Sequence, residues 1–156
     1  NEHANLNNIS NILVHQAAVS DQNGEVEFTR VLGNTTGSHI SGSKEKPYGD
    51  LEKFTVNTIA LPDIMKNVDL IKMDIEGHEA QALLATASAD WDNVDMMLEV
   101  GTPENAILIF KHITKLGLNM FSQKNGWAQG SSLDDLPTSY KEGSLFLTKK
   151  DGMHWA

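Results

Sequence analysis

The sequence predicts an α/β fold, with a mostly parallel sheet and helices on both of its faces. One reason is that apolar runs of strand length alternate with segments whose apolar residues recur at helical spacing. The other is the order of elements around residues 69–100. There, an apolar run at 69–73 passes through a turn at Gly77 into a helical pattern, and a second apolar run follows at 94–100. The order strand, helix, strand is typical of a parallel crossover.

The composition is that of an ordinary globular domain. The chain has 156 residues, of which 40% are hydrophobic and 21% charged, so we expect one domain over residues 1–156. A net charge of −9 disfavours nucleic acid as a partner, because phosphate chains are bound by clustered Lys and Arg. No apolar stretch reaches the roughly 20 residues that a membrane span needs. The lack of cysteine and of a basic-then-apolar leader favours a cytoplasmic protein.

The first half of the chain is expected to contain strands joined by turns and one long loop. An apolar run predicts a buried strand at 12–19, Asn23-Gly24 predicts a turn, and alternation of apolar and polar residues predicts a half-exposed return strand at 25–31. Residues 33–50 are too rich in Gly and Ser for a packed element. A loop of this length is usually functional or disordered. A strand is expected again at 53–59.

The later elements have clearer ends. Pro62 favours one helical turn at 61–65, and Thr102, followed by Pro and Glu, predicts a helix that Gly117 ends. Short apolar runs predict the last two strands, at 118–121 and 144–148. The helix after Gly77 should bury one face, which is formed by Ala80, Leu83, Leu84 and Ala87.

Carboxylates crowd the turn that follows the strand at 69–73. Asp74, Glu76 and Glu79 fall within six residues, at the carboxyl end of that strand, where open α/β sheets bind ligands. Glu99 ends the neighbouring strand and should emerge on the same edge, as a candidate substrate-binding residue. Helix capping is the plain alternative for the acids of the turn, and a solvated strand end is the alternative for Glu99.

Histidine and serine provide further candidates. Ser38 and His39 lie at the centre of the loop at 33–50 and could fold over the acidic turn as a lid, with His39 as a base that titrates near neutrality. An ordinary polar surface is the alternative. His78 lies within the acidic turn and is a candidate for substrate binding. Carboxylate oxygens there suit Mg²⁺ or Ca²⁺, but the histidine and cysteine spacings of a specific metal site are absent, so no metal is predicted.

The run V-D-L-I-K-M-D-I-E-G-H-E at 68–79 closely resembles the signature of the FkbM-type methyltransferases. These are S-adenosylmethionine-dependent enzymes with a Rossmann-like fold, and they mostly methylate hydroxyl groups. Four weaker features support the resemblance: A-A-V-S-D at 17–21 followed by Gly24, N-T-T-G-S-H at 34–39, the short turn at 61–64 and M-L-E-V at 97–100. The order and spacing of these motifs run through most of the chain.

The resemblance implies an O-methyltransferase of a small molecule or a sugar, with S-adenosylmethionine as the cofactor. By position, it places Ala17 and Ala18 near the adenine and Asp74 beside the reactive sulfonium. A carboxylate attracts that cation, and an acceptor hydroxyl has Asp74, Glu76 or His39 as candidates to take its proton.

The chain departs from the family at its start. Members begin with a strand and a glycine-rich loop that holds the methionine part of the cofactor, followed by a strand whose acid holds the ribose. No G-x-G pattern precedes Ile12. The resemblance therefore implies that residues 1–156 are a partial methyltransferase domain, without the N-terminal strands and the glycine-rich loop.

Two other functions are left open. In a receiver-like phosphoacceptor module, Asp74 would accept phosphate, but the stretch from Asp74 to the helix is short and no acidic pair occurs near the start of the chain. In a non-catalytic scaffold or interaction domain, the fold would persist without the cofactor loop. Equilibrium binding of S-adenosylmethionine separates a methyltransferase from the non-binding alternative.

Overall fold

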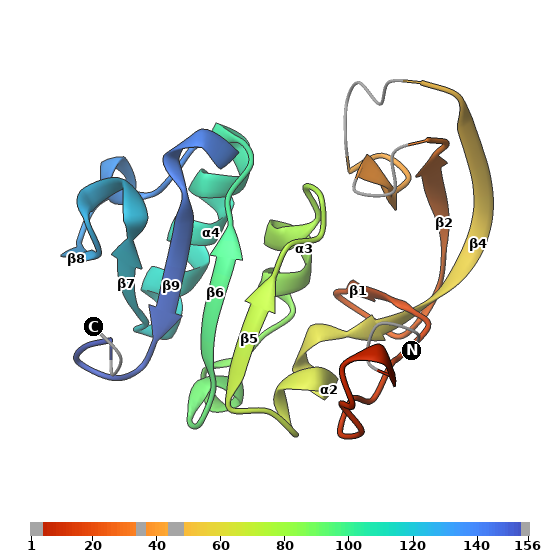
Figure 1. Cartoon of the computed structure of the whole chain (residues 1–156). Helices are drawn as coiled ribbons and strands as arrows, with labels where there is room; N and C mark the ends of the chain where they lie inside the picture. Colours follow the sequence, from red (N-terminus) through yellow and green to blue (C-terminus); the bar gives the residue numbers. More distant parts are fainter. Residues whose placement is uncertain (1–4, 34–36, 44–48, 154–156) are drawn as a thin grey trace.

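The strands of the protein form two sheets, which Figure 1 shows as separate groups of arrows. The structure is a computed structural model, and it describes residues 5–33, 37–43 and 49–153. The nine strands are β1 (Ala18–Ser20), β2 (Gly24–Val31), β3 (His39–Ile40), β4 (Leu51–Ala60), β5 (Leu70–Met73), β6 (Asp95–Glu99), β7 (Asn119–Ser122), β8 (Ala128–Gly130) and β9 (Ser144–Thr148). The first sheet has the order β1-β4-β2-β3, and the second has the order β5-β6-β9-β7-β8.

The four-stranded sheet is built around the long antiparallel pair of β2 and β4. Their register runs from Gly24 opposite Thr58 to Val31 opposite Leu51. Phe28 and Phe54 face each other across the pair, with ring centroids 5.8 Å apart, which is a stabilising cross-strand contact. β1 lies parallel to the end of β4, and β3 lies antiparallel to β2. The strands predicted at 25–31 and 53–59 are confirmed.

The five-stranded sheet contains the predicted parallel crossover. β5 pairs with β6 in parallel, with Met73 opposite Leu98, and α3 (Glu79–Leu84) lies between the two strands in the chain. The other pairings of this sheet are antiparallel: β9 pairs with both β6 and β7, and β8 pairs with β7. The last strand of the chain therefore lies inside the sheet, between β6 and β7.

The expectation of a mostly parallel, Rossmann-like sheet with helices on both faces is wrong. Among the described strands, two pairings are parallel and five are antiparallel. Only three α-helices lie wholly within the described ranges, namely α2 (Leu61–Met65), α3 and α4 (Pro103–Leu116). Antiparallel strands need only short connections, whereas every parallel pair needs a crossover. The connections from β7 to β8 and from β8 to β9 carry 3-10 turns instead of α-helices, so the fold is α/β with mixed sheets.

The strand predicted at 12–19 is largely absent. Strand pairing begins only at Ala18, and the apolar side chains before it are exposed, with Leu13 at 81% of its full accessible area. An apolar run forms a buried strand only where a sheet and a core receive it, and residues 11–17 make no strand pairing with the described part of the chain. The loop expected at 33–50 contains β3, and its residues 34–36 and 44–48 lie outside the described residues.

The helices begin and end where local signals place them. Pro62 stands in the first turn of α2, as predicted. At α4, Thr102 Oγ1 accepts a hydrogen bond from the backbone N–H of Asn105 at 3.2 Å, and Gly117 ends the helix with a φ of 72°. The helix α3 is shorter than its apolar pattern suggested, since it ends at Leu84. Of the face predicted to be buried, Ala80 and Leu83 are buried, but Leu84 and Ala87 are exposed, so that part of the prediction is wrong. None of the helices in the described ranges combines the length and apolar character needed to cross a bilayer.

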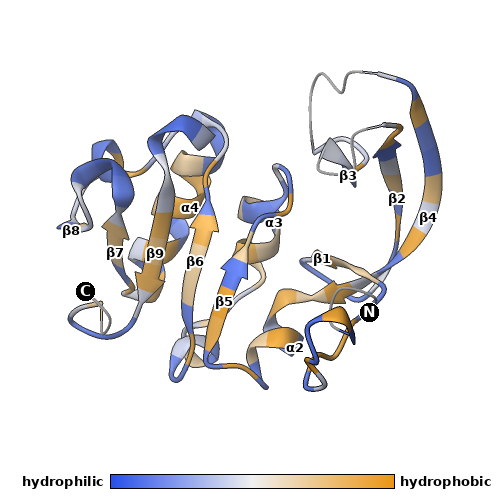
Figure 2. Cartoon of the chain, in the orientation of Figure 1, coloured by the Kyte–Doolittle hydropathy of each residue, from blue (hydrophilic) through white to orange (hydrophobic). Residues whose placement is uncertain are grey.

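The main hydrophobic core lies with the five-stranded sheet. Figure 2 shows mostly hydrophobic colours on β6 and β9, and four side chains of these strands, Met96, Leu98, Leu145 and Leu147, are completely buried. All buried members of this core cluster lie at residue 61 or later. The five-stranded sheet with its helices is therefore the rigid platform from which the turn after β5 projects.

Candidate functional site

The acidic turn between β5 and α3 is a tight backbone structure. Glu76 has a φ of 55° and Gly77 a φ of 98°, so two successive residues are left-handed. A Cβ on Gly77 would lie 2.5 Å from the carbonyl oxygen of Ser43, because the segment after β3 packs directly on the turn. Glycine is therefore required at this position both by its φ and by the close approach of another backbone segment.

Glu79 organises this turn from within. Its side chain is only 2% exposed, and its Oε1 accepts hydrogen bonds from the backbone N–H groups of Ile75 at 3.0 Å and Gly77 at 3.3 Å. The other oxygen, Oε2, is buried and has no hydrogen-bond partner within the described residues. Burying a carboxylate oxygen without a partner is costly.

Two further carboxylates gather where β5 and β6 end. Asp74 is exposed directly after β5, and Glu99 is the last residue of β6, the parallel neighbour of β5. The pKa of Glu99 is raised above its ordinary value, first by burial and then by the negative charge of Asp74, while Lys72 opposes the shift and Glu79 adds to it. This edge of the sheet is thus a region of negative potential.

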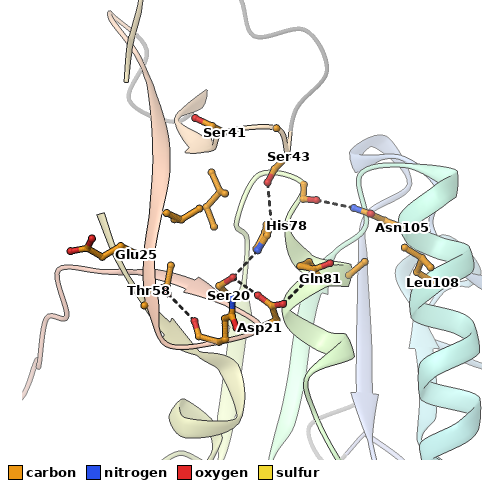
Figure 3. A pocket seen from close by; sticks show the side chains of 17 residues that line it. Ser20, Asp21, Glu25, Ser41, Ser43, Thr58, His78, Gln81, Asn105 and Leu108 are labelled. Carbon is orange, nitrogen blue, oxygen red and sulfur yellow. Dashed lines mark hydrogen bonds between the residues drawn. The ribbon is translucent and has the colours of Figure 1, made fainter. Parts of the chain in front are cut away.

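His78 joins the turn to the other sheet. Figure 3 shows its ring between Ser20 and Ser43: Nε2 lies 3.0 Å from Ser20 Oγ, and Nδ1 lies 3.1 Å from Ser43 Oγ. Ser20 Oγ donates its hydrogen to Asp21 Oδ1 at 2.8 Å. Because a hydroxyl has one hydrogen to give, Ser20 must accept at Nε2, so Nε2 carries the ring proton.

The ionisation of this network follows from its surroundings. Burial lowers the pKa of His78 below the ordinary 6.5, and the charge of Asp21 offsets part of this shift. The imidazole is therefore neutral near pH 7, and its Nδ1 accepts the hydroxyl hydrogen of Ser43. The pKa of Asp21 is lowered, mainly by the hydrogen bond from Ser20, and Gln81 Nε2 also donates to its Oδ2 at 2.8 Å.

A polar cavity of about 650 Å³ opens beside His78. Its walls come from the four-stranded sheet, the acidic turn and the helices α3 and α4. Figure 3 shows Glu25 and Thr58 from β2 and β4, Gln81 from α3, and Asn105 and Leu108 from α4. Asn105 Nδ2 also donates to the carbonyl oxygen of Gly77 at 3.2 Å, which fixes α4 against the acidic turn. A volume of this size suits a small ligand.

The loop residues Ser38 and His39 lie apart from the cavity beside His78. His39 is only 2% exposed, and its Nδ1 donates to the carbonyl oxygen of Gly37 at 2.9 Å. Ser38 Oγ accepts from the backbone N–H of Val31 at 3.3 Å. Neither residue is among the described residues that line the cavity. Their predicted roles as base and substrate-binding residue stay predictions.

The predicted adenine neighbours lie close to the His78 network in the chain. Ala18 begins β1, with Ala17 just before it, and both are half-buried. Ser20 ends the same strand, so residues 17–21 lead directly to the hydrogen bonds of His78.

Sequence reasoning missed the partners of His78. Ser20 and Asp21 were part of the A-A-V-S-D motif, but nothing in that motif indicated a hydrogen bond across 58 residues. Ser43, Gln81 and Asn105 carried no sequence signal at all. A serine or amide has no pattern of its own, and only the three-dimensional fold brings Ser20 and Ser43 to the histidine and Asn105 to the carbonyl oxygen of Gly77.

In the described ranges, no group of three or more His, Asp or Glu side chains is arranged to hold a metal ion. No curated protein and no solved structure gives a significant match to this chain. The family model of the methyltransferase FkbM domain matches residues 1–123. Since that match covers most of the 156 residues, the chain belongs to the FkbM methyltransferase domain family.

Proposed function

We propose that the chain is part of an S-adenosylmethionine-dependent O-methyltransferase that acts on a hydroxyl group of a small molecule or sugar. Family membership supports methyl transfer.

The observation that carries the proposal is the cluster of carboxylate side chains at the ends of β5 and β6. Burial, and after it the charge of Asp74, raises the pKa of Glu99, while Lys72 opposes the shift. Next to them, Glu79 Oε2 is a buried acceptor without a partner in the described residues. These carboxylates repel one another, and a cationic ligand would relieve that repulsion. The cluster therefore fits a sulfonium.

In this proposal, Asp74 and Glu99 hold the cationic end of the cofactor, which supplies an electrophilic methyl group when bound. The chain's own residues have two further tasks. They orient the acceptor hydroxyl, and alignment of this kind is worth up to about 7 to 11 kcal/mol in favourable cases. They also take the proton that the hydroxyl loses, which is a smaller effect.

The test compares the cation with its neutral counterpart. S-adenosylmethionine and S-adenosylhomocysteine differ by the methyl group and by the positive charge on sulfur, and isothermal titration gives the affinity of the full chain for each. Asp74→Asn should weaken S-adenosylmethionine by about tenfold, which is about 1.4 kcal/mol, and leave S-adenosylhomocysteine nearly unchanged. Asp69→Asn is the matched control, because Asp69 lies just before the other end of β5.

Two results would contradict the proposal. If Asp74→Asn weakens both ligands equally, Asp74 does not contact the charge. If the unaltered chain binds neither ligand, the non-catalytic scaffold becomes the better explanation. A receiver-like module is not favoured by any contact around Asp74, and labelling by acetyl phosphate in the presence of Mg²⁺ would be needed to revive it.

A further inference from the structure

We propose that His78 is the proton acceptor for the hydroxyl that is methylated, and that the cavity beside it binds a neutral polyhydroxylated molecule of the sugar class. This inference rests on the proposed function. It adds the identity of the base and the chemistry of the acceptor site.

The hydrogen-bond pattern leaves one basic atom on His78. Nε2 is committed as a donor to Ser20 Oγ, because the hydrogen of Ser20 goes to Asp21. Nδ1, on the other side of the ring, contacts only the hydroxyl of Ser43, 3.1 Å away, among the described residues. Ser43 lines the cavity, so a ligand hydroxyl that replaces Ser43 Oγ, or that hydrogen-bonds to it, reaches Nδ1 directly or through one hydroxyl.

The network behind the ring stabilises the charge that proton uptake would create. An imidazolium at His78 keeps its Nε2 hydrogen bond to Ser20, and Ser20 is bonded in turn to the carboxylate of Asp21. Asp21 is ionised, since the hydrogen bond from Ser20 lowers its pKa. The hydroxyl of Ser43, the imidazole of His78, the hydroxyl of Ser20 and the carboxylate of Asp21 follow one another in a chain of hydrogen bonds. His78 is thus a neutral base that is oriented, through Ser20, by a carboxylate, an arrangement suited to general-base catalysis.

The proposed step balances. The acceptor oxygen forms its bond to the methyl carbon while the carbon–sulfur bond breaks, and sulfur keeps the electron pair of that bond. The hydroxyl proton moves to His78 Nδ1 and later to water. The products are a methyl ether and a neutral thioether, and no oxidant or reductant is needed.

His39 is less suited to this role. Its Nδ1 already donates to the carbonyl oxygen of Gly37, and its side chain is only 2% exposed. A base must come within hydrogen-bond reach of the proton that it removes. His78, in contrast, lies in the wall of the cavity.

The lining indicates the class of acceptor. Hydroxyl groups come from Ser20, Ser41, Ser43 and Thr58, and side-chain amides from Gln22, Gln81 and Asn105. The described lining residues include no Lys or Arg, which disfavours a phosphate or carboxylate ligand, and no Phe, Tyr or Trp, which disfavours a flat aromatic ring. Hydroxyl and amide side chains both donate and accept hydrogen bonds, so a cavity of about 650 Å³ that they line suits a sugar ring.

Nuclear magnetic resonance of the histidine nitrogens tests the site without turnover. The full chain is titrated with methyl pyranosides of glucose, galactose, mannose and rhamnose. Free His78 should show a protonated Nε2 and an unprotonated Nδ1 at pH 7, and at least one pyranoside should shift the Nδ1 signal. His112 is the matched control, since it is also half-buried and its Nε2 lies 3.2 Å from Thr86 Oγ1, outside the cavity. The opposite tautomer, or no shift from any pyranoside, overturns the inference.

Variants test the proton transfer itself. With a pyranoside that is methylated, His78→Asn should lower kcat by roughly 10² to 10⁴-fold and leave the affinity for S-adenosylmethionine within about twofold of its original value. His112→Asn should leave both unchanged. If His78→Asn retains kcat while cofactor binding persists, His78 is not the base, but the proposed function stands. If no cofactor binds to the unaltered chain, the proposed function fails, and with it the role of His78 as a base.

A second variant serves if His78→Asn does not fold. Asp21→Asn removes the charge that raises the pKa of His78, so the acid limb of the kcat/KM profile should move to lower pH. Asp21 and Glu25 are the ionisable side chains besides His78 among the described residues that line the cavity, and Glu25→Gln should produce a smaller shift. If the acid limb of the kcat/KM profile does not move in Asp21→Asn, the proposed link from Asp21 through Ser20 to His78 is contradicted.

Discussion

His78 Nε2 and Ser20 Oγ lie 3.0 Å apart, although 58 residues separate them in the chain. Ser20 ends β1 in the four-stranded sheet, and His78 immediately precedes α3 after the five-stranded sheet. This hydrogen bond therefore joins the two sheets at the wall of the polar cavity, and it makes the geometry of the candidate site depend on how the sheets are held together.

Loss of this link should be measurable as stability. Ser20→Ala removes the hydroxyl that accepts from His78 and donates to Asp21, and Ser20 itself is buried. We expect the free energy of unfolding to fall by about 1 to 3 kcal/mol, because a buried donor loses its partner. Urea unfolding measures this loss, and Ser131→Ala, at an exposed position, is the control. Equal values for the two variants would mean that the link contributes nothing.

His78 should make the folded protein sensitive to mild acid. Burial lowers its pKa below the ordinary 6.5, so the unfolded chain takes up this proton first as the pH falls. The contribution of His78 is therefore fully present above pH 6.5 and is lost progressively below it. The difference in stability between the unaltered protein and His78→Asn should shrink between pH 7 and 5. The pKa of His112 is also lowered by burial, but His112 is present in both proteins, so its contribution cancels in the difference.

Glu99 should oppose folding at neutral pH. Its pKa is raised by burial and by Asp74, so the folded protein holds this proton more tightly than the unfolded chain does. Stability falls as the pH rises from the ordinary value of 4.5 through the raised value. Glu99→Gln should therefore be stabilising at pH 7, by less than about 1 kcal/mol for a partly exposed group, and neutral in acid. Thermal unfolding at both pH values, with the exposed Glu104→Gln as control, tests this sign.

The core prediction uses two leucines of contrasting exposure. Leu98 in β6 is completely buried, and Leu84 at the end of α3 is 42% exposed. Leu98→Ala should cost about 2 to 5 kcal/mol, because the cavity that it leaves cannot be filled by water. Leu84→Ala should cost much less. Comparable losses in chemical denaturation would show that the five-stranded sheet is not the main source of stability.

Gly77 should tolerate no side chain. Its φ is 98°, and an added Cβ would lie 2.5 Å from the carbonyl oxygen of Ser43. Gly77→Ala should destabilise the fold by about 1 to 3 kcal/mol and push Ser43 away from His78. The nitrogen signals of His78 should then change together with the unfolding midpoint. Gly101→Ala, where a Cβ meets nothing within 4 Å, is the matched control.

Elements with local signals could be predicted from the sequence. The helix α4 has a capping threonine and a terminal glycine, and the run at 69–73 leads directly into the turn at Gly77, so their positions follow from a few neighbouring residues. The pairing of the last strand between β6 and β7 depends on contacts across the whole chain, and no local pattern reveals it. The run at 12–14 was misleading because its apolar residues find no sheet to join.

The candidate site divides in the same way. Asp74 and Glu99 were predicted to meet because parallel strands end at one edge, and the structure places them within electrostatic reach. The role of Glu79 as a buried support of the turn was not foreseen, since an acid at a helix start is usually exposed. The hydrogen-bond partners of His78 come from two distant segments, at Ser20 and Ser43, and could be found only in the folded chain.

The concentration of the hydrophobic core at residues 61 and beyond has a consequence for motion. Backbone amides of β6 and β9 should exchange with deuterium only through nearly global opening, whereas those of β2 and β4 should exchange through local opening at a much lower free energy. The wall of the polar cavity formed by β2 and β4 would then move relative to the wall formed by α3 and α4. Ligand entry would not require the whole molecule to unfold.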